Sequence, residues 1–130
     1  MLVENVMTPA DKLIKVSPMA KVREALELMK ENGVHSIIVD KVSPYSAYGI
    51  ITFKNIMQSI VAEDGDIDLL NIYDIASTPA ISVSAHLDVK YASQMMVKNS
   101  IKRLLILDDN ELQGILTMTD IVETLLEVFE

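Results

Sequence analysis

The sequence contains no cysteine and no tryptophan, and only four of its 130 residues are glycine. The absence of cysteine excludes disulfides, zinc sites built on thiolates and catalysis by a thiol nucleophile. With so few glycines, the chain contains neither a glycine-rich phosphate loop nor a nucleophile elbow. No nucleophile is paired with a base in any motif of the sequence. We therefore expect a protein that is not an enzyme.

Long hydrophobic runs and positive charge are also scarce. No apolar run approaches the ~18 residues that a membrane span requires, so we expect no contact with a membrane. The 19 acidic residues outnumber the 11 basic ones, which gives a net charge of −8. Such a surface repels the phosphate backbone, so we expect no nucleic acid partner. The N-terminus carries no targeting pattern, and together with the lack of cysteine this favours a cytoplasmic location.

What the sequence does contain is a large apolar fraction, 50% of all residues, and an internal repeat. The stretch GILTMTDI at 114–121 matches GIITFKNI at 49–56, with Gly, Ile, Thr and Ile in register. Upstream, VHSIIV at 34–39 corresponds to IKRLLI at 101–106, and a Thr-Pro segment leads each copy. Self-similarity at a long period indicates duplicated structural units. We expect one compact module of three segments: a first repeat at 1–62, a linker at 63–69 and a second repeat at 70–130.

Both repeats have the same predicted order of elements. Ser17 and Pro18 fit the start of a helix, as a hydroxyl cap followed by proline, and Gly33 fits its end. The other elements predicted from apolar periodicity are strands 13–16, 34–39, 48–52, 80–83, 103–107 and 112–118 and helices 53–61, 68–76, 87–99 and 119–128. Each repeat is therefore β-α-β-β-α, an α/β (α+β) unit. Two such units are expected to bury their open sheet faces against each other with pseudo-twofold symmetry.

Two copies of β-α-β-β-α, each ending in Gly-aliphatic-aliphatic-Thr-x-x-Asp/Asn-Ile, resemble a tandem pair of CBS domains, the Bateman module. The resemblance covers about residues 1–60 and 70–130. It implies a cleft between the repeats that binds an adenosine compound: AMP, ADP, ATP, S-adenosylmethionine or NAD. It also implies a regulatory role, such as energy sensing, that acts on an effector protein. The alternative is a ligand-free structural or dimerisation module that acts only through protein–protein contacts.

The resemblance implies that Thr117 and Asp120 of the last motif contact the ligand. A carboxylate can accept hydrogen bonds from both hydroxyls of a ribose, and the following helix N-terminus offers N–H groups to a phosphate. The same residues also fit a capping box, with Thr117 or Thr119 as the cap and Asp120 returning to the backbone. The first repeat has Thr52 but Asn55 in place of the acid. Because an amide lacks the charge of a carboxylate, its cleft is expected to be the weaker.

The central strand of each repeat supplies a second part of the implied site. The resemblance places Lys102 and Arg103 of the second repeat, and His35 and Ser36 of the first, beside the nucleotide phosphates. Arginine suits bidentate phosphate recognition better than lysine does. From the residues alone, Arg103 also fits an exposed cation paired with one of the 19 acids. His35 also fits a partly buried structural imidazole.

By the same resemblance, both repeats contribute to each cleft. The Asp120 cleft is expected to use Thr8, Leu13, Val34, His35, Ile38, Arg103 and Thr117. The weaker cleft is expected to use Thr52, Asn55, Thr78, Ile81, Ile101, Lys102 and Leu105. No metal site is expected, because the two histidines are far apart in the sequence.

The last predicted helix carries more apolar residues than one core face needs. They form two lines along the helix, Ile121, Leu125 and Val128 on one and Val122, Leu126 and Phe129 on the other. In CBS pairs such helices join two modules. The resemblance therefore implies a homodimer.

Overall fold

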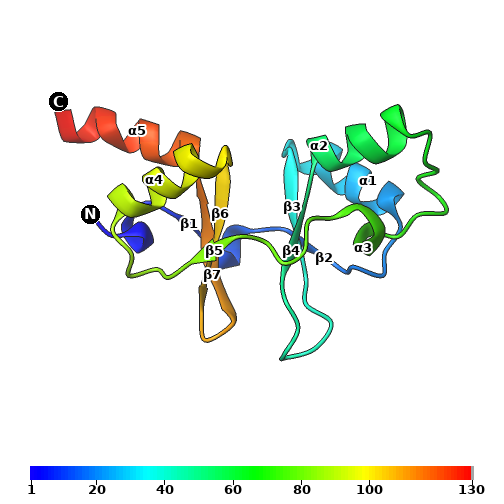
Figure 1. Cartoon of the computed structure of the whole chain (residues 1–130), viewed down its shortest axis with the longest axis horizontal. Coiled ribbons are helices and arrows are strands. Elements are labelled where there is room, and N and C mark those ends of the chain that lie inside the picture. Colours follow the sequence, from blue (N-terminus) through cyan, green and yellow to red (C-terminus); the bar gives the residue numbers. More distant parts are fainter. Residues whose placement is uncertain (130) are drawn as a thin grey trace. The chain divides into compact units, whose positions relative to one another are not determined.

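The structure is a computed structural model that describes residues 1–129, with side chains described up to residue 127 (Figure 1). The chain forms two compact units, and each has its own sheet and its own buried core. Unit 1 comprises Met1–Leu13 and Ile81–Glu130, and unit 2 comprises Ile14–Ala80.

Unit 2 has a three-stranded sheet in the order β2-β3-β4, with β2 parallel and β4 antiparallel to β3. Its strands are β2 (Lys15–Val16), β3 (Ser36–Val39) and β4 (Gly49–Thr52). Its helices are α1 (Val22–Asn32), α2 (Phe53–Ile56), the π-helical segment η3 (Met57–Ala62) and α3 (Ile72–Ile75). Because Val22, Ala25 and Met29 recur at helical spacing, α1 buries one stripe in the core of the unit.

Unit 1 has a four-stranded sheet in the order β1-β7-β6-β5. Its strands are β1 (Thr8–Pro9), β5 (Ser82–Val83), β6 (Arg103–Asp108) and β7 (Glu111–Thr117). Its helices are α4 (Val89–Asn99), α5 (Met118–Phe129) and the 3-10 turns η1 (Val3–Asn5) and η2 (Ala10–Lys12). The buried parts of α4 and of the two long strands form its core, which includes Ala92, Met96, Leu104, Ile106 and Leu116.

The predicted β-α-β-β-α order is confirmed in both repeats. It appears as β2-α1-β3-β4-α2 in unit 2 and as β5-α4-β6-β7-α5 in unit 1. In each unit the α-helices lie on one side of the sheet (Figure 1). The fold is therefore a mixed α/β fold built from a tandem repeat.

The packed units differ from the repeats along the sequence, because the leading segments are exchanged. Met1–Leu13 packs with the second repeat, and the linker region up to Ala80 packs with the first. Val3 is fully buried in unit 1 and donates its N–H to the carbonyl oxygen of Leu87 at 2.8 Å. Ile72 is fully buried in unit 2 and donates its N–H to the carbonyl oxygen of Ala20 at 2.8 Å. The two packed units therefore do not coincide with the two halves of the sequence.

The predicted start of the first helix at Ser17 and Pro18 is wrong. These residues form a turn, in which the Ser17 hydroxyl accepts the N–H of Met19 at 3.1 Å, and α1 begins at Val22. The N–H of Val22 donates a hydrogen bond to the carbonyl oxygen of Leu70 at 3.0 Å. A distant segment therefore satisfies the helix N-terminus that a local hydroxyl was expected to cap.

In unit 1, a carboxylate joins the end of β6 to the segment before α4. Asp108 accepts the hydroxyl of Ser84 at 2.7 Å and the N–H of Ala85 at 3.2 Å. Both hydrogen bonds favour the charged form, so they hold the pKa of Asp108 below its ordinary value. The stability that this carboxylate contributes therefore depends on pH.

We expect Asp108→Asn to lower the melting temperature at pH 7, because a neutral amide oxygen is the weaker acceptor. The higher melting temperature of the wild type is expected at all pH values above about 3.9, the carboxyl pKa of Asp108 in the unfolded chain. It is lost as the pH falls through the lower pKa that Asp108 has in the folded protein. Thermal unfolding between neutral and strongly acidic pH tests this. Asp109→Asn, in the exposed turn that follows, is the matched control. A difference in melting temperature that is the same at all pH values would contradict the assignment.

Candidate ligand-binding site

The junction between β7 and α5 holds the two residues of the last sequence motif. The N–H of Thr117 donates to Asp120 Oδ2 at 3.0 Å, and the N–H of Asp120 donates to Thr117 Oγ1 at 3.1 Å. The capping-box interpretation is therefore confirmed. The capping box uses only Oδ2 of Asp120. The other carboxylate oxygen, Oδ1, accepts no hydrogen bond from any residue that the structure describes. Capping holds Asp120 at the start of α5 and leaves that oxygen open.

Arg103 lies directly across the sheet from Thr117, in the antiparallel pairing of β6 with β7. Its side chain is partly buried, and within residues 1–129 it makes neither an ion pair nor a hydrogen bond. Burial lowers the pKa of its guanidinium. The interpretation as an exposed cation paired with an acid is therefore wrong. A partly desolvated cation without a partner favours an anion at this place.

Two further predicted residues belong to the same unit. Thr8 pairs with Ile115 in the contact of β1 with β7, two positions before Thr117 on that strand. Leu13 follows η2, and its N–H donates to the carbonyl oxygen of Ala10 at 3.1 Å. Unit 1 thus contains five of the eight residues predicted for the better cleft: Thr8, Leu13, Arg103, Thr117 and Asp120.

The other three, Val34, His35 and Ile38, belong to unit 2. His35 is exposed, and its ring stacks on Phe53 with 4.5 Å between the ring centroids. The interpretation of His35 as a partly buried structural imidazole is therefore wrong. Val34 and His35 line an open hollow between the end of α1 and the start of α2. Ile38 is only 2% exposed.

The matching edge of unit 2 differs in its charges. Asn55 Oδ1 accepts the N–H of Thr52 at 2.9 Å and its hydroxyl at 3.0 Å. Asn55 Nδ2 donates to the hydroxyl of Ser77 at 3.3 Å. Ser36, which is uncharged, pairs with Thr52 as Arg103 pairs with Thr117 in unit 1. This edge therefore has neither the free carboxylate oxygen nor the guanidinium.

Sheet register also shows which residue beside β4 corresponds to Thr8 beside β7. Thr8 pairs with Ile115, and Ser77 pairs with Ile50, the repeat mate of Ile115. Ser77, rather than Thr78, therefore takes the place of Thr8. The shared Thr-Pro dipeptides concealed this shift of one residue. The other predicted residues of the weaker cleft, Ile81, Ile101, Lys102 and Leu105, all belong to unit 1, where Lys102 is exposed and Leu105 is buried.

Among the described residues, no group of three or more His, Cys, Asp or Glu side chains could hold a metal ion. No helix of the described part of the chain is both long and apolar enough to cross a membrane.

Comparison with known proteins agrees with this architecture. The sequence matches the CBS domain family at residues 3–62 and 72–127. YhcV, a CBS domain-containing protein of Bacillus subtilis, is 31% identical over 114 residues, which cover 88% of this chain and 79% of YhcV. An uncharacterised protein of Methanopyrus kandleri is 35% identical over 114 residues, which cover 85% of this chain. The matched part spans 57% of that relative's length.

The fold is also that of a solved structure, CBSX2 in complex with AMP. The two chains superpose with a TM-score of 0.84 over 99% of each, at 21% sequence identity. Both family matches, and the β-α-β-β-α order found in each repeat, lead to one conclusion. The chain belongs to the CBS-domain proteins and carries two CBS domains in tandem.

Proposed function

We propose that this protein is a regulatory CBS pair that binds an adenosine compound with at least one phosphate. The edge of unit 1 formed by Arg103, Thr117 and Asp120 is the principal part of the proposed site. The observation that carries the proposal is the partly buried guanidinium of Arg103, which has no partner among residues 1–129 and lies across from Thr117.

The charges of this edge suit a ligand with two kinds of polar group. Arg103 and Asp120 carry opposite charges, yet they form no ion pair with each other. The guanidinium is suited to bidentate recognition of a phosphate, and the open oxygen of Asp120 is suited to accept a ribose hydroxyl. The N–H groups at the start of α5 favour a phosphate nearby. A nucleotide supplies both groups in one molecule.

CBSX2, which has the same fold, is solved with AMP, and this supports AMP as the first compound to examine. The edge of unit 2 has Asn55 and Ser36 in place of Asp120 and Arg103. Its amide is already engaged by Thr52 and Ser77. We therefore propose one stronger site in each chain and a second site that is weak or empty.

The regulatory step is proposed to act through a partner protein. A ligand shifts a conformational equilibrium only by binding one state better than the other. We propose that the bound state differs in its affinity for an effector. Three apolar side chains of α5 are exposed to solvent: Val122 by 57%, Leu125 by 44% and Leu126 by 64%. We propose that this apolar surface joins two copies in a homodimer. The side chains of Val128 and Phe129, predicted to extend this surface, lie outside the described residues.

Thermal unfolding with AMP, ADP, ATP or NAD tests the proposed function, and S-adenosylmethionine, which carries no phosphate, is the comparison compound that should have the smaller effect. A compound at a hundred times its dissociation constant adds roughly 2.7 kcal/mol of stability, which raises the melting temperature by several degrees. Asp120→Asn should remove most of this rise. The variant has asparagine at position 120, and asparagine already forms a capping box with threonine in unit 2, where Asn55 pairs with Thr52. The helix cap of α5 should therefore be retained.

Asn55→Asp, the reverse exchange in unit 2, is the companion variant and should leave the rise intact. A rise of the same size in wild type and Asp120→Asn would remove Asp120 from the site. No rise with any compound would contradict the ligand-binding function and favour the ligand-free structural module.

A further inference from the structure

Two segments of the chain connect the units, and the first of them runs from β1 of unit 1 through η2 to β2 of unit 2. We call it the first crossing, residues 8–16. At its end it forms the edge of the β2-β3-β4 sheet. The N–H of Ile38 donates to the carbonyl oxygen of Ile14 at 3.3 Å. The N–H of Asp40 donates to that of Val16 at 2.8 Å. These two amides therefore report how firmly the crossing is held at its end.

The second crossing, residues 77–83, runs from unit 2 back to unit 1. It begins at Ser77, which pairs with Ile50 of β4, and ends in β5 at the edge of the other sheet. The carbonyl oxygen of Ile81 accepts the N–H of Leu105 at 3.0 Å. Each crossing therefore starts beside the last strand of one repeat and ends in the first strand of the other.

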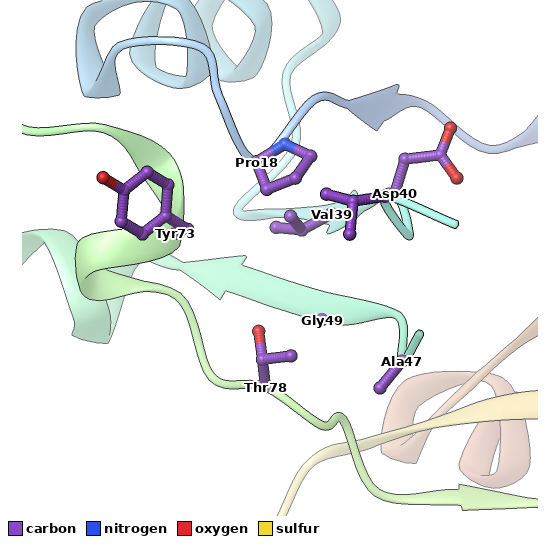
Figure 2. A pocket seen from close by; sticks show the side chains of 8 residues that line it. Pro18, Val39, Asp40, Ala47, Gly49, Tyr73 and Thr78 are labelled. Carbon is purple, nitrogen blue, oxygen red and sulfur yellow. The ribbon is translucent and has the colours of Figure 1, made fainter. Parts of the chain in front are cut away.

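Both crossings lie close against a glycine where they start. A Cβ added to Gly114 would collide with the carbonyl oxygen of Thr8. A Cβ added to Gly49 would collide with Oγ1 of Thr78, and Figure 2 shows these two residues side by side. Close-packed groups transmit a displacement instead of absorbing it. A change in how the start of a crossing is held is therefore expected to reach its end.

In unit 2, a side-chain hydrogen bond holds the start of the second crossing. Asn55 Nδ2 donates to the hydroxyl of Ser77 at 3.3 Å, and Asn55 Oδ1 accepts the N–H of Thr52 at 2.9 Å. In unit 1, Asp120 Oδ2 accepts the N–H of Thr117 in the same way. Oδ1 of Asp120 therefore takes the place of Asn55 Nδ2, the atom that holds Ser77.

The corresponding hydrogen bond is absent from the described part of unit 1. Thr8 takes the place of Ser77, but its hydroxyl forms no hydrogen bond with Asp120 or with any other described residue. An open carboxylate oxygen and an open hydroxyl can be bridged by a ligand hydroxyl, which donates to the carboxylate and accepts from the threonine. Unit 1 therefore leaves to a ligand the connection that unit 2 makes with its own side chains.

We propose that the nucleotide supplies this connection: a ribose hydroxyl bridges Asp120 and Thr8, and the first crossing carries the effect to β2 in unit 2. The inference rests on the proposed function, since it uses the same nucleotide at the same edge. A crossing that is held at Thr8 detaches less often from β3, so the N–H groups of Ile38 and Asp40 exchange more slowly with solvent. Binding in unit 1 thereby changes the stability of an edge strand in unit 2.

Amide hydrogen exchange of the full chain, followed residue by residue by NMR, tests the mechanism first without a ligand. Ser77→Ala removes the hydrogen bond at the start of the second crossing. The N–H of Leu105 should then exchange roughly 3- to 10-fold faster, the range for one hydrogen bond. Thr8→Ser combined with Asp120→Asn gives unit 1 the pair that unit 2 has, so the N–H of Ile38 should exchange more slowly by the same factor. Thr8→Ser alone is the matched control and should exchange like the wild type.

The second step repeats the measurement with saturating AMP, ADP, ATP or NAD, and calorimetric titration establishes which of them binds. Exchange of the Ile38 N–H should slow in the wild type but not in Thr8→Val, which lacks the hydroxyl. The N–H of Ile72, a fully buried residue of unit 2, is the internal control for general stability. Slower exchange at Ile38 counts only where it exceeds that at Ile72.

The outcomes separate this inference from the proposed function. If one of the compounds binds and exchange at Ile38 slows no more than at Ile72, only the inference is wrong. If none of them binds, both are wrong. Unchanged exchange at Leu105 in Ser77→Ala, or at Ile38 in the double variant, would show that a crossing does not carry the effect of such a hydrogen bond, and the inference would fail without any ligand.

Discussion

Arg103→Met is expected to weaken the binding of a nucleotide by roughly 10- to 100-fold while making the ligand-free protein more stable. Hydrogen bonds to charged groups contribute about 1.5–3 kcal/mol, and each 1.4 kcal/mol is tenfold in affinity. In the absence of ligand, the guanidinium is partly buried without a partner among the described residues. Methionine has a similar length and no charge to desolvate, so it should suit that environment better.

Calorimetric titration with the compound that raises the melting temperature most, together with urea unfolding of the ligand-free protein, measures both effects. Lys98→Met is the matched control, because it removes the same charge from an exposed residue of α4 that belongs to neither proposed cleft. It should change the affinity much less. Loss of stability together with unchanged affinity in Arg103→Met would show that Arg103 has a structural role and binds no phosphate.

Gly114→Ala is expected to destabilise unit 1 by about 1–3 kcal/mol, the range for overpacking a well-packed site. A Cβ at this position would collide with the carbonyl oxygen of Thr8 and lie 2.9 Å from the Met7 sulfur. Because Gly114 pairs with Pro9, β1 must move away from β7 to make room. Thr8 would move with it, so the affinity for the nucleotide should also fall.

Urea unfolding and the same ligand titration test this expectation. Gly33→Asn is a suitable control, because Gly33 has a positive φ of 61° that asparagine tolerates, and an added Cβ meets no atom within 4 Å. It should remain close to wild type. A Gly114→Ala protein with wild-type stability would show that the close approach of β1 to β7 is not required.

The sequence by itself determined the repeat, the order of elements in each copy and the family. These depend on local patterns: apolar residues at helical or strand spacing, and a Gly-aliphatic-aliphatic-Thr-x-x motif at Gly49 and Gly114. The capping box of Thr117 also follows from local spacing, because cap and partner are three residues apart. The charge difference between Asp120 and Asn55 is likewise read from the sequence alone.

Only the tertiary structure decided which segments pack together. Val3 and Ile72 are each fully buried in the unit formed mainly by the other repeat, and no periodicity indicates which sheet an isolated apolar residue will meet. The alignment of Ser77, instead of Thr78, with Thr8 depends on strand register, which backbone pairing sets. Whether Arg103 has a partner depends on which of the 19 acids lie within reach. Burial, register and charge pairing join residues far apart in the chain, so they become defined only when the chain is folded.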